Sequence, residues 1–258
     1  MKERVAVIDA DSIAYFSSKD TLEESLANLD KFIPLILNRT KCSKYVLFLS
    51  ARVKEYFRKK IFEGYKSKRP KTQMILKYLN EVKATMFEKY HAITIVGVEA
   101  DDLVALAAKQ YSGEYTVVVC SPDKDVLKTI PGRHFNYRTH KFIDTTMDEA
   151  IEFIWLQCLH GDATDGIVGI PGIGPVKALQ ILHNGVSEND TNETKYKKFQ
   201  INVFDAYLAH YKRMHTAIFE FQKNFRLVYL LRDKEEYKAE IGYEIILPEP
   251  FSLYSEEE

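Results

Sequence analysis

Short apolar runs alternate along the first two thirds of the chain with segments in which apolar residues recur at helical spacing. Runs at residues 4–8, 45–49, 92–96 and 115–120 predict four buried strands. The helical segments include one that starts at Thr21 and is kinked or split at Pro34. Residues 133–142 indicate a hairpin or a further strand pair, and Thr146 with Glu149 caps a later helix. This alternation predicts an α/β fold with a mainly parallel central sheet and helices on both faces.

Carboxylates directly follow three of the four predicted strands. Asp9 follows the first strand, Glu99 opens the helix after the third, and Asp123 follows the fourth. Acids are ordinary in a first helical turn, but parallel strands bring their carboxyl ends to one edge, where ligands bind. Carboxylates gathered there repel one another unless a cation binds, and their hard oxygens suit Mg²⁺ or Mn²⁺. We therefore predict a metal site at this edge, with further acids close by at Asp11, Asp101, Asp102 and Asp125.

The charge of the chain is unevenly distributed behind a formal net charge of −1. Residues 51–90 hold twelve Lys and Arg against four acids, and residues 195–226 hold seven against two, whereas residues 91–194 and 233–258 are acidic. Basic segments are candidate phosphate contacts. Gly64 and Pro70 interrupt the first of them, which predicts two helices with a mobile joint.

Three widely spaced cysteines fit neither a disulfide framework nor a zinc cluster, which favours a reducing cytoplasm. No apolar run reaches the roughly 20 residues that span a bilayer, and the N-terminus lacks the apolar segment of a signal peptide. We therefore expect a cytoplasmic protein without a membrane partner.

A glycine-rich segment precedes a predicted helix near the middle of the chain. It runs from Gly169 through Pro171, Gly172, Ile173 and Gly174 into a helix with Lys177 in its first turn. Glycines allow tight turns and close backbone approach, and a helix N-terminus presents amides to an anion. The pattern is typical of a helix–hairpin–helix that binds the nucleic-acid backbone and reads no base edges.

Taken together, the motifs resemble the structure-specific 5′-nucleases, the flap endonuclease and 5′→3′ exonuclease family. The resemblance is to its stand-alone bacteriophage members and to the 5′-nuclease domain of bacterial DNA polymerase I, and it extends from Val5 to about Leu182. The motifs, in family order, are Asp9, Phe57-Arg58, Tyr65-Lys66-x-x-Arg69, Glu99-Ala-Asp101-Asp102, Asp123-Lys-Asp125, Gly161-Asp162-x-x-Asp165 and Gly169-Ile-Pro-Gly172-Ile-Gly174. The resemblance implies a PIN-like sheet, a helical arch over about 51–90 and the helix–hairpin–helix. We expect a nuclease core over 1–160, a helical region over 161–226 and an acidic segment over 227–258 with a disordered end.

The resemblance also implies roles for particular residues in a two-metal phosphodiesterase that uses Mg²⁺ or Mn²⁺. The first ion is expected at Asp9, Glu99, Asp101 and Asp102, and the second at Asp123, Asp125, Asp162 and Asp165. Lys66 and Arg69 are expected to reach the scissile phosphate, with Arg58 as a further catalytic cation and Tyr65 stacked on the terminal base. Contacts to DNA are expected from Lys59, Lys68, Gly169, Gly172, Ile173, Gly174 and Lys177, with K⁺ at the helix–hairpin–helix.

Ser50 departs from the family pattern. The family commonly carries an aspartate at the end of the second strand, whereas this chain reads Leu47-Phe48-Leu49-Ser50. The serine brings no charge, so weaker binding of the first metal is expected. Asp11, two residues beyond Asp9, is an extra acid that we expect to compensate in part.

The expected activity is metal-dependent hydrolysis of DNA near 5′ ends, nicks, flaps and single-strand–double-strand junctions, with RNA–DNA hybrids as a further substrate. A replicative polymerase or a single-strand-binding protein is the expected partner, and the chain is expected to be a monomer in a bacterial or phage-infected cytoplasm. Two alternatives remain. One is a flap- or junction-binding protein that has lost cleavage, favoured by Ser50. The other is a PIN-type ribonuclease, against which the helix–hairpin–helix counts.

Overall fold

The structure is a computed structural model that describes residues 2–67 and 76–253. The chain divides into two compact units. The first comprises residues 1–57, 70–145 and 230–258, and the second residues 58–69 and 146–229. This division differs from the expected boundaries. The helix over 147–160 packs on the helices that follow it, and the segment after residue 230 returns to the sheet, where residues 251–252 pair with the second strand. Within the described residues, no helix is long and apolar enough to cross a membrane.

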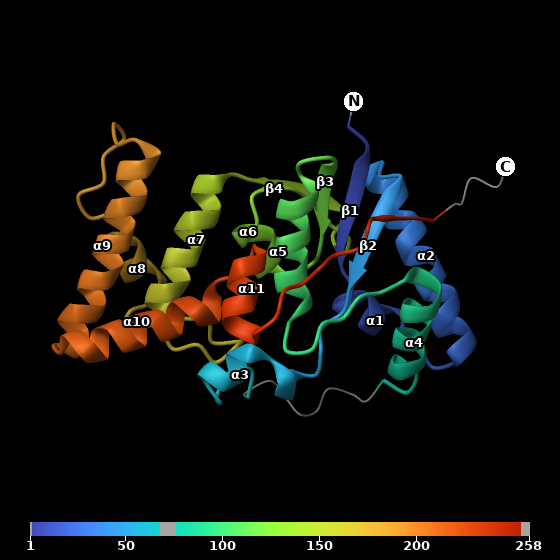
Figure 1. Ribbon diagram of the computed structural model, residues 1–258, viewed down its shortest axis with the longest axis horizontal. Coiled ribbons are helices and arrows are strands. Elements are labelled where there is room, and N and C mark those ends of the chain that lie inside the picture. Colours follow the sequence, from blue (N-terminus) through green and yellow to red (C-terminus); the bar gives the residue numbers. More distant parts are fainter. Residues whose placement is uncertain (1, 68–75, 254–258) are drawn as a thin grey trace. The chain divides into compact units, whose positions relative to one another are not determined.

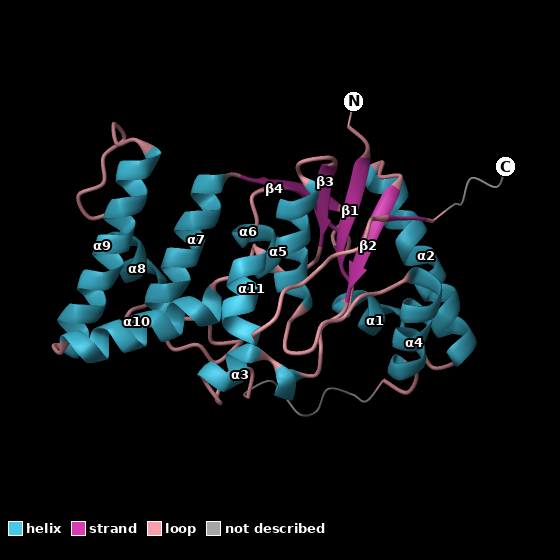
Figure 2. Cartoon of the chain, viewed as in Figure 1, coloured by secondary structure: helices cyan, strands magenta, loops and turns pink. Residues whose placement is uncertain are grey.

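A six-stranded sheet forms the centre of the first unit (Figure 2). Its strands are β1 (Arg4–Asp9), β2 (Lys44–Phe48), β3 (Thr116–Cys120), β4 (Gly132–Asn136), β5 (Lys141–Thr145) and β6 (Phe251–Ser252). They lie in the order β5-β4-β3-β1-β2-β6. The pairings β1–β2, β1–β3 and β3–β4 are parallel, whereas the hairpin pairing β4–β5 and the edge pairing β2–β6 are antiparallel. The expected mainly parallel sheet and its hairpin are confirmed.

The expected strand over 92–96 does not form. Only Ile93 pairs with β2, where its backbone N–H donates to the Leu47 oxygen at 2.8 Å and its oxygen accepts from Leu49 at 2.9 Å. The chain then turns through Gly97, whose φ of +83° is the left-handed region that favours glycine. The turn follows the pairing too soon for a strand to extend, although the apolar residues alone suggested one.

Helices cover the sheet of the first unit, as expected from the alternation. They are α1 (Asp11–Ser17), α2 (Leu22–Thr40), α4 (Leu79–Tyr90), α5 (Ala100–Tyr111), α6 (Lys124–Thr129) and α11 (Lys234–Ile241), with a 3₁₀ turn over Val53–Glu55. Helix α2 starts after Thr21, whose side chain accepts from the Glu24 amide. It runs unbroken through Pro34, which corrects the expectation of a split. A proline within a helix removes one hydrogen bond, and the tertiary packing of α2 outweighs that loss.

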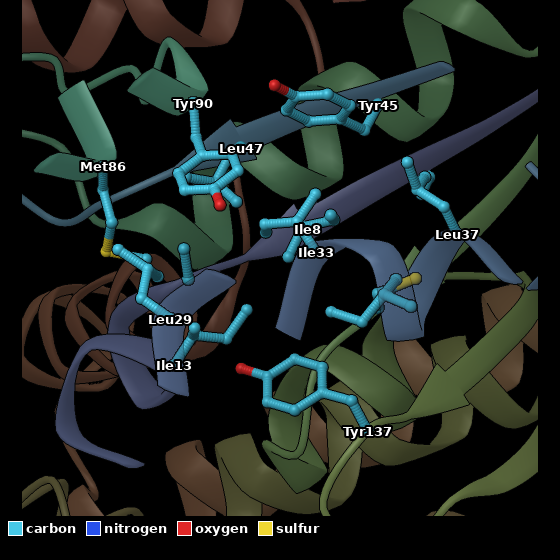
Figure 3. Packing of buried hydrophobic residues seen from close by; sticks show 14 of the residues in the cluster. Ile8, Ile13, Leu29, Ile33, Leu37, Tyr45, Leu47, Met86, Tyr90 and Tyr137 are labelled. Carbon is cyan, nitrogen blue, oxygen red and sulfur yellow. The ribbon is translucent and has the colours of Figure 1, made fainter. Parts of the chain in front are cut away.

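The core of the first unit lies between the sheet and helices α1, α2 and α4 (Figure 3). Alternate residues of a strand face opposite sides of the sheet, and here Ala6 and Ile8 of β1 pack with Leu29 and Ile33 of α2. Helix α5 packs on β1, β2 and β3, and its buried residues are not part of this cluster. It therefore covers the opposite face, so the sheet is buried on both sides.

The second unit is helical (Figure 1). Its helices are α3 (Phe57–Ile61), α7 (Met147–His160), α8 (Pro175–Leu182), α9 (Asn192–Tyr211) and α10 (Met214–Val228). The expected capping box of Thr146 and Glu149 is present at the start of α7. The basic stretch near 195–225, which reads as one helical segment, is two helices. They separate at Lys212, whose φ of 59° ends α9.

Candidate metal centre and nucleic-acid interface

Asp9 ends the central strand β1 and is buried, with 4% of its surface exposed. One carboxylate oxygen accepts from the Ser121 hydroxyl at 2.8 Å, and the other accepts from the Asp11 backbone N–H at 3.2 Å. Burial, followed by the nearby charges of Asp11 and Asp123, raises the pKa of Asp9 to about 7. The sequence therefore buries a carboxylate beside two others at the predicted sheet edge.

Ser121 and Tyr137 position Asp9 and were missed by the sequence analysis. Ser121 directly follows β3 and is fully buried. Its position at a strand end could have identified it as a site residue from the sequence. Tyr137 follows β4 and donates its hydroxyl to the Asp9 backbone oxygen at 2.7 Å. Nothing in the local sequence pointed to Tyr137, because the contact spans 128 residues.

Glu99 is the N-cap of α5, where the sequence predicted a helix to begin, and it is buried. The cap bond itself comes from Ser50, whose hydroxyl oxygen accepts from the Ala100 backbone N–H at 2.8 Å. The Ser50 backbone N–H donates to a carboxylate oxygen of Asp11 at 3.2 Å. Asp11 thus reaches from the end of β1 to the end of β2, and Ser50 fixes the start of the helix that carries Glu99.

Asp101 and Asp102 lie in the first turn of α5 and differ in their surroundings. Asp102 is fully buried, and one of its carboxylate oxygens accepts from the Leu231 backbone N–H at 3.0 Å. That bond ties α5 to the returning segment of the first unit. It gives Asp102 a structural role, and Asp101 is the better candidate for the metal.

Asp123 and Asp125 begin α6, directly after β3. The Asp123 carboxylate caps this helix by accepting from the Asp125 backbone N–H at 2.7 Å, and its own N–H donates to Ser121 at 3.0 Å. Lys124 lies 3.8 Å from the Asp125 carboxylate. Ser121 therefore joins the acidic ends of β1 and β3 through its single hydroxyl.

The donor set of the first unit suits a hard divalent cation. Asp11 and Asp123 lie close enough to Asp9 for their charges to raise the pKa of its carboxylate. A cation among the three carboxylates would relieve that repulsion. Across residues 2–67 and 76–253, no group of three or more His, Cys, Asp or Glu side chains is placed so that it could hold a metal ion. Mg²⁺ does not require one, because it usually keeps several waters and binds one or two carboxylates.

Two further predicted metal ligands belong to the second unit, where they are held by local contacts. Asp162 accepts from the Thr164 backbone N–H at 2.7 Å, and Asp165 lies 3.7 Å from the Lys66 ammonium. Tyr65 donates to the Asp165 carboxylate at 3.4 Å. The metal-binding roles of Asp162 and Asp165 stay predictions from the resemblance.

The predicted catalytic residues near α3 are mostly buried. Tyr65 is buried and Lys66 has 8% of its side chain exposed, so both pack on Asp165 here and do not face solvent. Arg58 is 1% exposed and donates to the backbone oxygens of Leu227 at 3.1 Å and Tyr229 at 2.7 Å. These bonds anchor α3 to the end of α10, which argues against the expected contact between Arg58 and a substrate phosphate.

The remaining arch residues give a partial picture. Lys59 donates to the Glu63 backbone oxygen at 2.8 Å and lies on α3. Lys68 and Arg69, expected to contact DNA and the scissile phosphate, lie outside the described residues.

The predicted helix–hairpin–helix segment divides into a buried and an exposed part. Gly169 is buried and donates its N–H to the Asn224 side chain at 3.1 Å. A Cβ on Gly169 would lie 2.5 Å from the Gly161 nitrogen, so this glycine serves close packing. The Gly169 amide is thus used within the protein, and its expected phosphate contact stays a prediction. Gly172 and Gly174 are exposed before α8, and Ile173 between them is partly exposed.

Helix α8 begins as the sequence predicts. Gly174 is its N-cap, Pro175 occupies the first helical turn and Lys177 is exposed on it. Gly172 has a φ of +80° with open space around its Cα, so it is there for its conformation. The assignment of the whole segment as a helix–hairpin–helix stays a prediction.

Comparison with known proteins gives a consistent result. The family described as "5'-3' exonuclease, N-terminal resolvase-like domain" matches residues 4–152, more than half of the chain. A 5'-3' exonuclease of Buchnera aphidicola subsp. Schizaphis graminum is 30% identical over 183 residues, which cover 64% of this chain and 62% of that protein. A DNA polymerase I of Rhizobium leguminosarum is 32% identical over 137 residues, 49% of this chain and 14% of that protein. The matches thus span less than two thirds of these relatives.

A solved structure shares the fold. It is the bacteriophage T5 D15 flap endonuclease, described as a pseudo-enzyme-product complex with DNA and metal ions. The TM-score is 0.58 at 16% identity, covering 88% of this chain and 99% of that one. With the acidic sheet edge and the matched residues 4–152, these findings lead to one assignment: the chain belongs to the 5′-3′ exonuclease family through its N-terminal resolvase-like domain.

Proposed function

We propose that this chain is a divalent-metal-dependent 5′ nuclease that hydrolyses phosphodiester bonds of DNA near 5′ ends and single-strand–double-strand junctions. One observation carries the proposal. Asp9 is buried at the end of the central strand, and its pKa is raised to about 7 by burial and by the charges of Asp11 and Asp123. Buried like charges destabilise a fold, and a bound cation would offset their repulsion. Family membership and the metal and DNA in the T5 relative support the same reading.

The site residues have separable roles in this mechanism. Asp9, Asp11, Glu99, Asp101 and Asp123 would hold the metal, which supplies a Lewis acid and a water of lowered pKa. Ser121 keeps one Asp9 oxygen in place by hydrogen bonding, and Ser50 fixes the helix start that carries Glu99. Preorganised ligands avoid rearrangement during the reaction.

Cationic groups of the second unit complete the proposal. Lys66 pairs with Asp165 at 3.7 Å in the structure. A substrate phosphate would compete for this ammonium, which would then offset negative charge in the transition state. The exposed Gly172, Gly174 and Lys177 before and within α8 would hold the duplex backbone. Two Mg²⁺ or Mn²⁺ ions, K⁺ at this segment, a monomeric state and a cytoplasmic location remain part of the proposal.

Cleavage of a 5′-labelled flap with Mg²⁺ and with EDTA tests the proposal. We expect labelled products only with Mg²⁺, loss of product for Asp123→Ala, and retention for Asp144→Asn, an exposed carboxylate on β5 outside the site. Tight flap binding without cleavage by the unmutated protein would contradict the enzyme reading and favour a junction-binding protein. Cleavage of single-stranded RNA in preference to DNA flaps would favour the PIN-type ribonuclease. The same assay with RNA–DNA hybrid substrates measures primer removal.

A further inference from the structure

A pocket of about 420 Å³ lies in the first unit between α1, α2 and the turn that joins β4 to β5. Its walls are aromatic. The ring centroids of Phe16 and Phe32 lie 6.4 Å apart and are stacked, and the Tyr137 ring meets Phe32 edge-on, also at 6.4 Å. Phe16, Phe32 and Leu35 pack against the hydrophobic core, of which Tyr137 is part. The walls of this aromatic pocket are therefore set by the fold before any ligand binds.

The rim of the aromatic pocket is basic. Lys31, Arg138 and His140 line it, and none of the described residues that line the pocket is an acid. The Arg138 guanidinium carbon lies 5.8 Å from the centroid of the Phe16 ring. Within the part of the chain that the structure describes, no carboxylate pairs with Lys31 or Arg138. The rim thus holds positive charge that no described carboxylate pairs with.

The turn that carries Arg138 is held in place by local bonds. The Asn136 side-chain oxygen accepts from the backbone N–H groups of Arg138 and Thr139, each at 3.0 Å. His140 closes the turn with a φ of 56°. Such a side-chain-to-backbone arrangement fixes a turn without a ligand, so the backbone that carries Arg138 is held beside the pocket.

The pocket is joined directly to the strand that bears the candidate metal ligand. Tyr137, in its wall, donates its hydroxyl to the Asp9 backbone oxygen at 2.7 Å. A ligand stacked in the pocket would rest on a side chain that contacts the catalytic strand end.

We propose that the aromatic pocket binds one unstacked nucleotide of a single-stranded DNA segment, with the base against Phe16 and Phe32 and a flanking phosphate on Lys31 and Arg138. This assignment rests on the proposed function, since it takes DNA as the substrate. The volume falls in the range of about 300–1,000 Å³ typical of small-ligand sites. Aromatic rings accept any base by stacking, and adjacent cations track the backbone. A purely apolar partner would leave Lys31 and Arg138 desolvated without a counter-charge.

Binding of fluorescein-labelled oligothymidylate in EDTA, followed by anisotropy over a series of salt concentrations, tests the assignment. Arg138→Gln removes one phosphate contact, and we expect about fivefold weaker binding and a salt slope shallower by about 0.7. Phe16→Leu removes stacking but no charge, so it should weaken binding about five- to tenfold with the slope unchanged.

Arg133→Gln is the matched control. Arg133 is exposed on the same hairpin and also lies over an aromatic ring, 4.8 Å from the Phe142 centroid, but it does not line the pocket. We expect this variant to bind as the unmutated protein does. Equal binding by Arg138→Gln and Arg133→Gln would overturn the assignment. Arg138 is an exposed turn residue, so this comparison does not depend on whether Phe16→Leu folds.

Two further measurements identify the source of the nucleotide and test the pocket separately from the nuclease activity. Free thymidine monophosphate should displace the oligonucleotide poorly, and displacement at equal nucleotide concentration would overturn the assignment to a strand. Flap cleavage with Mg²⁺ is measured on the same proteins. Failure of cleavage by the unmutated protein refutes the proposed function, whereas failure of the Arg138→Gln effect with cleavage intact refutes only the pocket.

Discussion

Replacing the buried carboxylate of Asp9 with an amide should stabilise the metal-free protein at high pH. Folding raises the pKa of Asp9 from 3.8 to about 7, mainly because the carboxylate is buried. The folded state therefore binds this proton more tightly than the unfolded chain does. Stability is lost as the pH rises from about 4 to about 7, and the full loss is present above that range. The variant Asp9→Asn has no charge to bury at any of these pH values.

The expected size follows from the structure. A shift of roughly three pKa units corresponds to about 4 kcal/mol at about 1.4 kcal/mol per unit. The amide offers one acceptor oxygen in place of two, which disturbs the bond from Ser121 or from the Asp11 backbone N–H. That loss costs about 1 kcal/mol. We therefore expect Asp9→Asn to be about 2–3 kcal/mol more stable than the unmutated protein at pH 8 in EDTA, and about 1 kcal/mol less stable below pH 4.

Urea unfolding in EDTA across this pH range measures the effect. Asp144→Asn is the control, because its carboxylate is exposed and lies outside the site. Mg²⁺ at about a thousandfold its dissociation constant should reverse the order at pH 8, since a ligand at that concentration stabilises the unmutated protein by about 4.1 kcal/mol. An Asp9→Asn variant that is less stable by the same amount at every pH would contradict this expectation, because it would show that Asp9 carries no buried charge.

Three further substitutions test single contacts of the structure. Ser50→Ala removes the acceptor for the Ala100 backbone N–H and should lower the unfolding free energy by about 1 kcal/mol, whereas Ser50→Thr, measured beside it, should retain most of the stability. Asp11→Asn should weaken Mn²⁺ binding about tenfold, because one negative charge beside the ion is lost; the affinity is measured by paramagnetic relaxation of water, and an unchanged value removes Asp11 from the site. Arg58→Met leaves the Leu227 and Tyr229 oxygens without their donor and should destabilise by about 2–4 kcal/mol. If Arg58→Met instead keeps its thermal midpoint and loses only cleavage, Arg58 is catalytic after all.

Most of the sheet could be predicted because its signals are local. The runs at 4–8, 45–49 and 115–120 became β1, β2 and β3 within one residue at each end. The failure at 92–96 has a physical cause, since an apolar run permits pairing but the turn through Gly97 stops it after Ile93. The prediction of a split at Pro34 was also wrong. Local propensity predicts a break there, but the packing of α2 keeps the helix continuous.

The candidate site was predicted as a set of residue types but not as a set of contacts. Acids at predicted strand ends identified Asp9 and Asp123, because parallel strands end at one edge of the sheet. They also identified Glu99 at the start of α5, although the strand expected before it does not form. The motif predicts a catalytic role for Arg58, which stays a prediction, whereas the structure shows Arg58 buried and bonded to the Leu227 oxygen at the end of α10. Charge and spacing cannot distinguish these roles, because burial depends on residues far away in the sequence.

By itself, the sequence determined the order of the elements, the edge at which acids gather and the basic segments beside them, because these follow from periodicity and chain direction. Only the tertiary structure decided which groups serve the fold. It assigns Ser50 to the cap of α5, Ser121 to the Asp9 carboxylate and Gly169 to packing. Each of these contacts joins segments at least 50 residues apart. A hydrogen bond across that separation depends on how the chain packs, which no local pattern encodes.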